Sequence, residues 1–371
     1  MAKRIIQFGT SRFLQAHADL FIHEARVSGQ DIGPITVVKT TRGTERAGRV
    51  SAFGTAEGYP VIIRGLVDGK TVDKTLNVKS IDHALMADRD WQELVDLFAN
   101  QAQIVVSNVG ESGYAIPVED EVNLSSGDWV PLSFPGKLLR LLAARHRAGG
   151  KPILILPCEL VTENGKVLRR LLVDLGAKWK LGATFNTWMA SQVTICDTLV
   201  DRIVSEAIEP VGAIAEPYAL WAIKREASCD IPFTHPAVVV TDDLEPYLRL
   251  KLHILNLGHT FLAEIWQTEK RPANETVREI LSDLAIKRRL TDLYSEEVIP
   301  GFAGHGMVDA ATTYVTTTLE RFENPFLNHR LSDIAQHHHL KIERRVVDFI
   351  AWIRLRNPTA NVARLQMLAQ R

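Results

Sequence analysis

The chain has 371 residues, of which 46% are hydrophobic and 23% charged, an ordinary composition for a soluble globular protein with room for two domains. Its 43 basic and 44 acidic residues give a formal net charge of −1, so no overall positive field favours a nucleic acid or an anionic membrane. No apolar run approaches the roughly 20 residues that cross a bilayer, and the N-terminus lacks the apolar core of a signal peptide. The three cysteines, Cys158, Cys196 and Cys229, form no CxxC pair, so we expect a reduced, cytoplasmic protein without a disulfide framework.

The first half of the chain alternates short β-rich runs with helical segments. This alternation predicts a Rossmann-like, doubly wound and mostly parallel sheet. A helix is expected over residues 11–27. The expected strands are residues 4–8, 35–39, 104–108 and 153–157.

Two features complete this half. Residues 59–81 alternate around an Asp-Gly pair, which predicts an antiparallel hairpin inserted into the parallel fold. A further strand is expected over residues 237–242, and from Glu245 onward the periodicity is helical. We therefore expect a dinucleotide-binding domain over 1–242 and a mainly helical domain, carrying substrate and catalytic residues, over 243–371.

The turn after the first strand, "FGTSRF", lies where an open parallel sheet binds a phosphate group. Gly9 ends the strand and Ser11 can cap the next helix, so that backbone N–H groups at its start hold a pyrophosphate. Only one glycine of the G-x-G-x-x-G pattern is present, so an ordinary turn remains the alternative. The predicted cofactor residues in this turn are Gly9, Thr10, Ser11, Arg12 and Phe13.

The second and third strands also end in candidate cofactor residues. Lys39 and Arg42 stand where an acidic residue would bond the ribose of NAD. They indicate either NAD with the ribose held differently, or NADP with its 2′-phosphate bound by these cations, or two solvated charges. After the third strand, Ser107, Asn108 and Gly110 suit close approach to a ribose or nicotinamide, although each lies in a loop of a generic kind.

The stretch "KLHILNLGH" places Lys251, Asn256 and His259 on an otherwise apolar helix. At about 100° per residue, His259 falls about 80° and Asn256 about 140° from Lys251, so the three share one side. Partial burial would lower the pKa of Lys251 and suit it to exchange a proton with an alcohol. Asn256 and His259 would bond the reacting oxygen, and Gly258 would admit substrate or another backbone. The alternative is that Lys251 reaches solvent and His259 is a satisfied core histidine.

The K-x4-N-x2-H pattern at 251–259, preceded by "EPY", resembles the long-chain polyol dehydrogenases of the mannitol dehydrogenase family. The opening "FGTSRFLQAH" is similar to that family's first turn, with Gln15 in place of its usual arginine. "TLVDRI" at 198–203 also resembles a family segment. The segment 321–346 and "PCELVTENG" look like the tagaturonate and fructuronate reductase branch.

This resemblance implies an NAD(P)-dependent oxidoreductase that interconverts an alcohol of a polyol or sugar acid and its ketone, without a catalytic metal. Lys251 would be the general acid/base, and Asn256 and His259 would polarise the reacting oxygen. Asp201 would lie near the substrate, and Arg321 and Lys341 would supply cations for a substrate carboxylate, which Arg321 would bond bidentately.

Two departures from the polyol enzymes favour the uronate branch, or a relative with a different substrate: Leu248 replaces a frequent glutamate and Leu160 a frequent asparagine. The histidines at 337–339 would point in different directions on a helix, so we predict no metal site. A monomer or small homo-oligomer is expected. The alternative function is a non-catalytic nucleotide- or sugar-sensing protein on the same fold.

Overall fold

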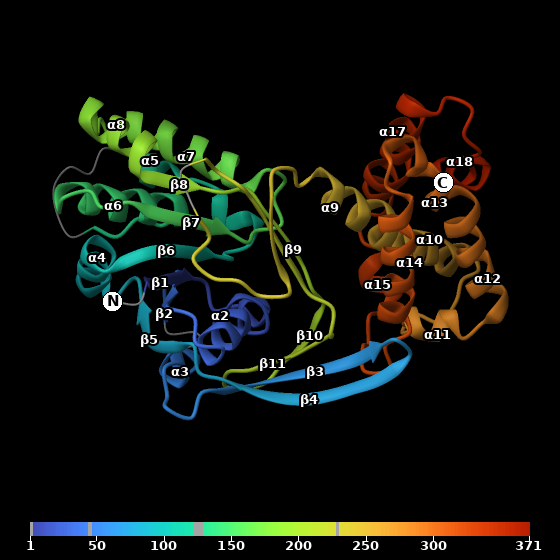
Figure 1. The fold of residues 1–371 in the computed structure, drawn as a ribbon, viewed down its shortest axis with the longest axis horizontal. Coiled ribbons are helices and arrows are strands. Elements are labelled where there is room, and N and C mark those ends of the chain that lie inside the picture. The colour runs from blue at the N-terminus through green and yellow to red at the C-terminus, as the bar shows by residue number, and fades with distance from the viewer. Residues whose placement is uncertain (1–2, 44–46, 122–128, 228–229) are drawn as a thin grey trace. The chain divides into compact units, whose positions relative to one another are not determined.

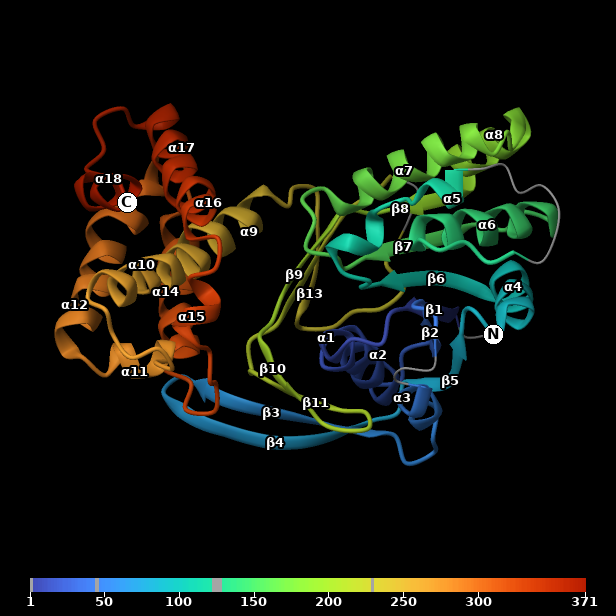
Figure 2. The same cartoon turned by 180° about the vertical axis from the view of Figure 1, so that it is seen from behind.

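The computed structural model describes residues 3–43, 47–121, 129–227 and 230–371 (Figure 1 and Figure 2). The chain divides into two compact units, one built mainly from the first 244 residues and one from the remainder. The N-terminal unit comprises Met1–Ile62, Thr75–Ala215 and Ala219–Leu244, and the C-terminal unit comprises Ile63–Lys74, Glu216–Tyr218 and Glu245–Arg371.

A six-stranded sheet in the order β5-β2-β1-β6-β7-β8 forms the centre of the N-terminal unit, and all its neighbouring strands pair in parallel. This is the doubly wound order, and the predicted fold class is confirmed. Strands β2 and β5 are added on one side of β1, and β6, β7 and β8 on the other, so the strand order reverses at β1. Such folds bind ligands at the carboxyl ends of the strands beside this reversal. The strands are β1 (Lys3–Phe8), β2 (Ile32–Lys39), β5 (Ile81–Met86), β6 (Ala102–Ser107), β7 (Ile153–Pro157) and β8 (Val193–Ile195).

Apolar side chains on one face of this sheet, among them Ile6, Phe8 and Val105, form a core with the larger helices of the unit. Burying this continuous apolar face drives the helices onto the sheet. The helices are α1 (Arg12–Gln15), α2 (Ala18–Val27), α3 (Ala47–Ala52), α4 (Trp91–Asn100), η1 (Glu111–Tyr114), α5 (Val118–Glu121), α6 (Phe134–Arg147), α7 (Asn164–Lys178) and α8 (Gly182–Gln192).

The prediction of one helix over residues 11–27 is wrong, because the helix breaks between α1 and α2. His17 has φ −127° and ψ −98°, outside the helical region. Its ring is buried between those of Phe13 and Phe21, and its Nε2 lies 3.1 Å from the carbonyl oxygen of Leu220. These tertiary contacts override the local helical pattern.

The predicted hairpin is present as β3 (Tyr59–Val67) and β4 (Lys70–Val78). Asp68 and Gly69 both have positive φ, as a two-residue turn of type I′ requires. The hairpin joins a four-stranded sheet with β10 (Val204–Ala207) and β11 (Ala213–Ala215). The expected strand near 237–242 is β13 (Val238–Thr241), which pairs in parallel with β12 (Leu220–Lys224); β12 also pairs with β9 (Thr198–Asp201), and these three strands form a separate sheet.

From Glu245 onward the described chain is helical, and its own apolar core is built from these helices. No helix among the described residues is long and apolar enough to cross a membrane. The helices are α9 (Glu245–Leu250), η2 (Lys251–Asn256), α10 (Leu257–Thr268), α11 (Val277–Leu281), α12 (Leu284–Leu293), η3 (Tyr294–Val298), α13 (Ile299–Gly301), η4 (Ala303–His305), α14 (Val308–Phe322), α15 (Leu331–Ile334), α16 (His338–Ile342), η5 (Glu343–Val347), α17 (Asp348–Arg356) and α18 (Ala363–Ala369).

The helix that carries the K-x4-N-x2-H pattern is not a regular α-helix. Between α9 and α10, the segment η2 forms a π-turn over Lys251–Asn256. Hydrogen bonds in a π-turn join residues five apart instead of four. The uniform rotation of about 100° per residue therefore does not hold in this segment, and the angles predicted from the sequence need correction there.

Side chains from two other π-turns bond the backbone of η2. Tyr294, the first residue of η3, donates its hydroxyl to the carbonyl of Ile254 at 3.0 Å. Arg345, in η5, donates from Nη1 to the carbonyl of Asn256 at 3.2 Å. Such partners are needed because a buried carbonyl oxygen without a hydrogen bond costs free energy, and a break in the regular helical pattern can leave carbonyls without one.

Gly258 makes the approach of Tyr294 possible. A Cβ at position 258 would lie 2.0 Å from the Tyr294 hydroxyl and 2.9 Å from the Phe322 ring. The glycine therefore admits these two side chains, and not the substrate or backbone that the sequence suggested.

We expect Gly258→Ala to lower the free energy of unfolding by about 1–3 kcal/mol, because the added methyl group displaces the Tyr294 hydroxyl. Tyr294→Phe alone should also destabilise, since it leaves the Ile254 carbonyl without this donor. The double variant should lose less stability than the sum of the losses in the two single variants, because the hydroxyl that would clash with the added methyl group is absent. Urea denaturation followed by circular dichroism measures all three. Strict additivity would contradict the proposed contact.

Candidate functional site

The turn after β1 is shaped by the close approach of three strand ends. Gly9 has φ +113°, and its N–H bonds the carbonyl of Val38 at 3.0 Å. A Cβ at this position would lie 2.5 Å from the carbonyl oxygen of Asn108. Only glycine fits both the conformation and the space, so Gly9 fixes the turn where β1, β2 and β6 end.

Four consecutive backbone donors follow Gly9. Among the described residues, no acceptor bonds the N–H groups of Thr10, Ser11, Arg12 or Phe13. The Ser11 hydroxyl caps α1 by accepting from Leu14 N at 3.2 Å, as predicted for a helix start. Although α1 has only four residues, these N–H groups form a cluster suited to an anion.

The side chains around this turn mainly brace the loops. The Ser11 hydroxyl donates to Oδ1 of Asn108 at 2.9 Å, and Nδ2 of Asn108 donates to the carbonyl of Cys158 at 2.7 Å. The Ser107 hydroxyl donates to Glu159 at 3.1 Å. Three of the predicted cofactor residues therefore tie together the ends of β1, β6 and β7.

Sequence reasoning missed Glu159, which organises the loop after β6. Its buried carboxylate accepts hydrogen bonds from Ser107, from the N–H of Val109 and from the hydroxyl of Tyr114. Burial raises the pKa of Glu159, although these hydrogen bonds oppose the rise. Beyond this loop Gly110 is exposed, with nothing within 4 Å of the place where a Cβ would stand.

Lys39 and Arg42 differ in their surroundings. The buried Lys39 ammonium donates to the carbonyls of Thr41 and Gly43, at 2.6 and 2.9 Å, and so folds the loop after β2 over itself. Arg42 is exposed, and its Nη2 donates to the carbonyl of Val130 at 3.1 Å. Of the two predicted cations, Lys39 holds the loop and Arg42 projects from it.

In the C-terminal unit, the π-turn aligns the three residues of the predicted catalytic helix. Lys251 and Asn256 are five residues apart, which is the hydrogen-bonding period of η2. Asn256 and His259 are three residues apart at the start of α10, a spacing that places side chains on one face of an α-helix. The spacing therefore predicts one row of the three residues along one side of the helix, in which Lys251 and Asn256 are half-buried and His259 is buried.

The two histidines of this helix have different roles. His253 is a satisfied core residue: its Nδ1 lies 3.1 Å from the carbonyl oxygen of Arg345, and its ring stacks on Phe349. His259 is 6% exposed, and its Nε2 is buried without a hydrogen-bond partner among the described residues. The reading of a satisfied core histidine therefore applies to His253.

Several cationic or polar groups surround His259. The ring of His329 lies edge-on to it, with centroids 4.7 Å apart, and the buried Nδ1 of His329 also lacks a partner within the described part of the chain. Burial lowers the pKa of His259 well below its usual value, and the charges of Arg345, Arg321 and Lys341 lower it further. The structure thus gathers both predicted cations around the predicted catalytic histidine.

Arg321 is buried in an ion pair. Its Nε and Nη2 donate to the two carboxylate oxygens of Glu216, at 3.0 and 2.8 Å. Its Nη1 donates to the hydroxyl of Tyr314, and its guanidinium lies 4.4 Å from the ring centroid of Tyr218. The bidentate edge that the sequence assigned to a substrate carboxylate is thus bonded to Glu216, and this detail of the expectation needs correction.

Lys341 and Arg345 differ from Arg321, because neither forms an ion pair within the described part of the chain. Lys341 donates to the carbonyl of Ile334 at 2.7 Å. Arg345 bonds Thr260 as well as Asn256, through the same Nη1. Burial lowers the pKa of both groups, that of Arg345 to about 10. Sequence reasoning missed Arg345, whose only signal was a second arginine in "ERRV".

The other predicted positions lie as follows. Asp201 is buried at the end of β9 in the N-terminal unit, opposite Leu220 of β12. Leu248 is half-buried in α9, and Leu160 is 67% exposed in the loop after β7. Cys158 and Cys196 are buried, whereas Cys229 lies outside the described residues. Among the described residues, no group of three or more histidine, cysteine or acidic side chains is placed to hold a metal ion.

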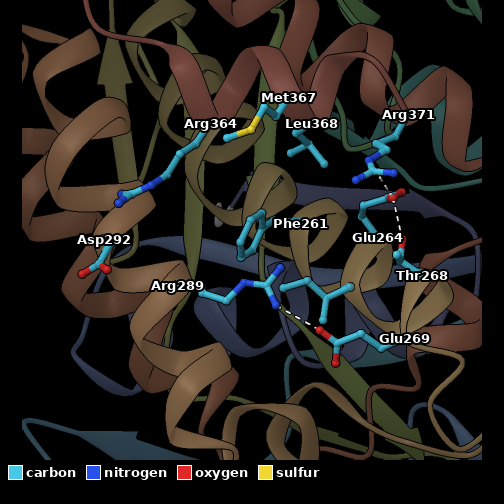
Figure 3. A pocket seen from close by; sticks show the side chains of 11 residues that line it. Phe261, Glu264, Thr268, Glu269, Arg289, Asp292, Arg364, Met367, Leu368 and Arg371 are labelled. Atoms are coloured by element: carbon cyan, nitrogen blue, oxygen red, sulfur yellow. Dashed lines mark hydrogen bonds and ion pairs between the residues drawn. The ribbon is translucent and has the colours of Figure 1, made fainter.

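A separate pocket of about 300 Å³ is lined in part by Phe261, Glu264 and Thr268 of α10 (Figure 3). Its arginines are already paired: Arg289 with Glu269 at 3.0 Å, and Arg371 with Glu264 at 3.8 Å. Arg364, also in its lining, pairs with Glu296 at 2.8 Å. Its walls offer an anion no unpaired cation, in contrast to the surroundings of His259.

Two family models match the chain, and together they cover most of it. The model described as the mannitol dehydrogenase Rossmann domain matches residues 3–232. The model described as the mannitol dehydrogenase C-terminal domain matches residues 243–368.

Similar proteins agree with these matches. The altronate oxidoreductase of Halalkalibacterium halodurans is 31% identical over 360 residues, covering 90% of this chain and 67% of that protein. A D-sorbitol dehydrogenase in substrate-free form has a TM-score of 0.78 at 19% identity, over 94% of this chain and 76% of that one. The mannitol 2-dehydrogenase of Pseudomonas fluorescens, in a ternary complex with NAD and D-mannitol, has a TM-score of 0.74 at 21% identity, over 99% and 78%. These two structures share the fold.

We expect the rings of His253 and His259 to remain neutral between pH 7.5 and pH 5. Burial lowers the pKa of His253 to about 3 and that of His259 well below its usual value. Since an unfolded histidine titrates near pH 6.5, acid favours the unfolded form, and both residues should reduce the stability of the C-terminal unit as the pH falls through that value. Proton–carbon NMR of labelled histidines, assigned with His259→Gln, measures this directly. A ring resonance that moves with a midpoint above pH 5 would exclude the assigned burial.

Proposed function

Because the chain belongs to the mannitol dehydrogenase family of oxidoreductases, we propose that it interconverts a secondary alcohol of a sugar acid and the corresponding ketone by hydride transfer with NAD. The feature that supports this proposal is the spacing of Lys251, Asn256 and His259 over the π-turn η2 and the start of α10, which favours one side of the helix for all three. The resemblance to this family, including its uronate branch, is confirmed by the family models and the altronate oxidoreductases.

A sugar acid is favoured over a neutral polyol by charge. Lys341 and Arg345 lie near His259 and form no ion pair within the described part of the chain. Partly buried cations are stabilised by an anionic partner. The relative from Halalkalibacterium halodurans is named an altronate oxidoreductase. Altronate is a sugar acid, and its carboxylate would serve as that partner.

The proposed chemistry assigns one role to each residue of the row. The bound nicotinamide supplies or accepts the hydride at the reacting carbon. Lys251 delivers a proton to the carbonyl oxygen during reduction and removes it during alcohol oxidation. Asn256 donates a hydrogen bond to this oxygen as negative charge develops. His259, kept neutral by burial, donates a second hydrogen bond while remaining neutral itself.

The turn after β1 fits a dinucleotide. The N–H groups of residues 10–13 offer four neighbouring donors to a pyrophosphate, beside the point where the strand order reverses. Ser11, Ser107 and Asn108 would keep the loops in place, and Gly110 would leave room for the ribose or nicotinamide. NAD, the dinucleotide in the mannitol 2-dehydrogenase complex, is the proposed cofactor, with NADP as the alternative.

The remaining assignments stay proposals. Asp201 is assigned to the substrate, and Lys341 to the anionic group of the substrate. Arg321, bonded to Glu216, would act mainly by holding the wall of the site. We also propose that no metal takes part, that the enzyme is cytoplasmic, and that it is a monomer or small homo-oligomer.

We predict that Lys251→Met lowers kcat by about 10²–10⁴-fold, the usual contribution of a general acid/base. The assay mixes the protein with NADH or NADPH and a panel of ketouronates and ketoses, and follows nicotinamide absorbance. Lys270→Met, at an exposed lysine of the same unit, is the matched control and should retain activity. Turnover at the normal rate in Lys251→Met would refute the mechanism. The absence of turnover with every substrate and either cofactor, with cofactor binding retained, would favour the sensing protein.

We predict that Arg42→Ala raises KM for NADPH about 10- to 100-fold and leaves KM for NADH within about twofold, since a phosphate contact by one arginine contributes about 1.5–3 kcal/mol. Lys39→Met should raise both values, because Lys39 organises the whole loop after β2. Steady-state kinetics with both cofactors separates the two roles. Equal effects of Arg42→Ala on NADH and NADPH would rule out a role for Arg42 in choosing the cofactor.

A further inference from the structure

Three cations approach His259, and their charges are balanced differently. Arg321 is neutralised by the two oxygens of Glu216. Lys341 and Arg345 each donate to neutral oxygens, and neither forms an ion pair with a described residue. Two positive charges therefore remain uncompensated beside His259.

Geometry places these two charges together. Lys341 and Arg345 are four residues apart across α16 and η5, so they lie on neighbouring turns of one helical face. The charge of Arg345 contributes to lowering the pKa of Lys341, which reflects their proximity. Like charges on one face are unfavourable, and a shared anion would relieve the repulsion.

The guanidinium of Arg345 has one edge engaged and one available. Nη1 makes both of its hydrogen bonds, to the carbonyl of Asn256 and to the hydroxyl of Thr260. No hydrogen bond joins its Nε or Nη2 to any residue in the described ranges. Nε and Nη2 form the planar fork that receives a carboxylate bidentately.

We infer that Arg345, and not Arg321, receives the carboxylate of a sugar-acid substrate on its Nε and Nη2 edge, with Lys341 as a second cation. Arg345 thereby selects sugar acids over neutral polyols. This inference rests on the proposed function. It also couples selection to the catalytic row, because Nη1 of the same guanidinium holds the backbone of Asn256.

The test compares one acid with one neutral substrate in the full chain. Arg345→Gln removes the charge, the fork and the Nη1 donor to the Asn256 carbonyl. We expect it to raise KM for a ketouronate about 10- to 100-fold, as for the loss of a charged hydrogen-bonded contact. The kcat/KM for a neutral ketose should fall only by the factor that the lost Nη1 bonds impose on both substrates, so that the ratio of kcat/KM for the ketouronate to that for the ketose falls about 10- to 100-fold. Arg344→Gln, at the exposed neighbouring arginine, is the control and should change neither.

A purely structural role of Arg345 gives a different result. If the side chain serves only the π-turn, Arg345→Gln lowers kcat/KM for both substrates by the same factor, and the inference is overturned. Arg321→Gln provides that pattern for comparison, since it leaves the buried Glu216 without its partner and should impair both substrates alike. If Arg345→Gln does not fold, Arg345→Lys keeps a charge without the fork and should show the same selective loss, smaller in size.

A binding measurement separates this inference from the proposed function. Calorimetric titration of the protein with altronate and with a neutral polyol needs no turnover. We expect the wild type to bind altronate at least 10-fold more tightly than Arg345→Gln does, with equal polyol binding. If the wild type binds altronate in this way but turns over no substrate, the proposed function fails and the inference stands. Equal altronate binding by wild type and Arg345→Gln refutes the inference even if the enzyme is active.

Discussion

The π-turn over Lys251–Asn256 is the constraint on which the proposed row of Lys251, Asn256 and His259 depends. In a regular α-helix, residues five apart differ by about 140° around the axis, so Lys251 and Asn256 would diverge. A turn whose hydrogen bonds join residues five apart brings them back to one face, and the following α-helical step of three adds His259. The irregular backbone thus produces the alignment that the K-x4-N-x2-H spacing requires. Tyr294 and Arg345 hold it in place by bonding two of its carbonyls.

The three π-turns of the C-terminal unit stabilise one another. Tyr294 begins the second and bonds the first, and Arg345 lies in the third and also bonds the first. In return, His253 of the first turn bonds the backbone carbonyl of Arg345. The first turn leaves carbonyls that need partners, and side chains of the other two turns supply donors to two of them. Gly258 belongs to the same arrangement, because a side chain there would exclude the Tyr294 hydroxyl.

The fold class follows from the alternation of strands and helices, since this pattern is local. The break at His17 could not be predicted, because it depends on Leu220, about 200 positions away in the sequence. The same limit applies within "KLHILNLGH". His253 and His259 look equivalent in the sequence, and only the packing of Phe349 shows which is satisfied. Likewise, the sequence suggested Arg321 as the cation for a substrate carboxylate. Glu216, over 100 residues from Arg321 in the sequence, neutralises it, and we therefore assign this contact to Arg345. The spacing of Lys251, Asn256 and His259 was visible in the sequence, whereas the π-turn at η2 and the charges around His259 depend on the folded structure.

This difference explains why the predicted catalytic residues stand out in the sequence and the predicted cofactor residues do not. At the turn after β1, the groups suited to a dinucleotide are backbone N–H groups, which any sequence provides once Gly9 and the braces at Ser11 and Asn108 fix the loop. A full glycine pattern is therefore not required there. On the catalytic helix, a proton donor and two oxygen ligands must be particular side chains at fixed spacing. In this proposal, selection among substrates depends on charges outside that row. A change at Arg345 would alter the substrate class and leave Lys251, Asn256 and His259 in place.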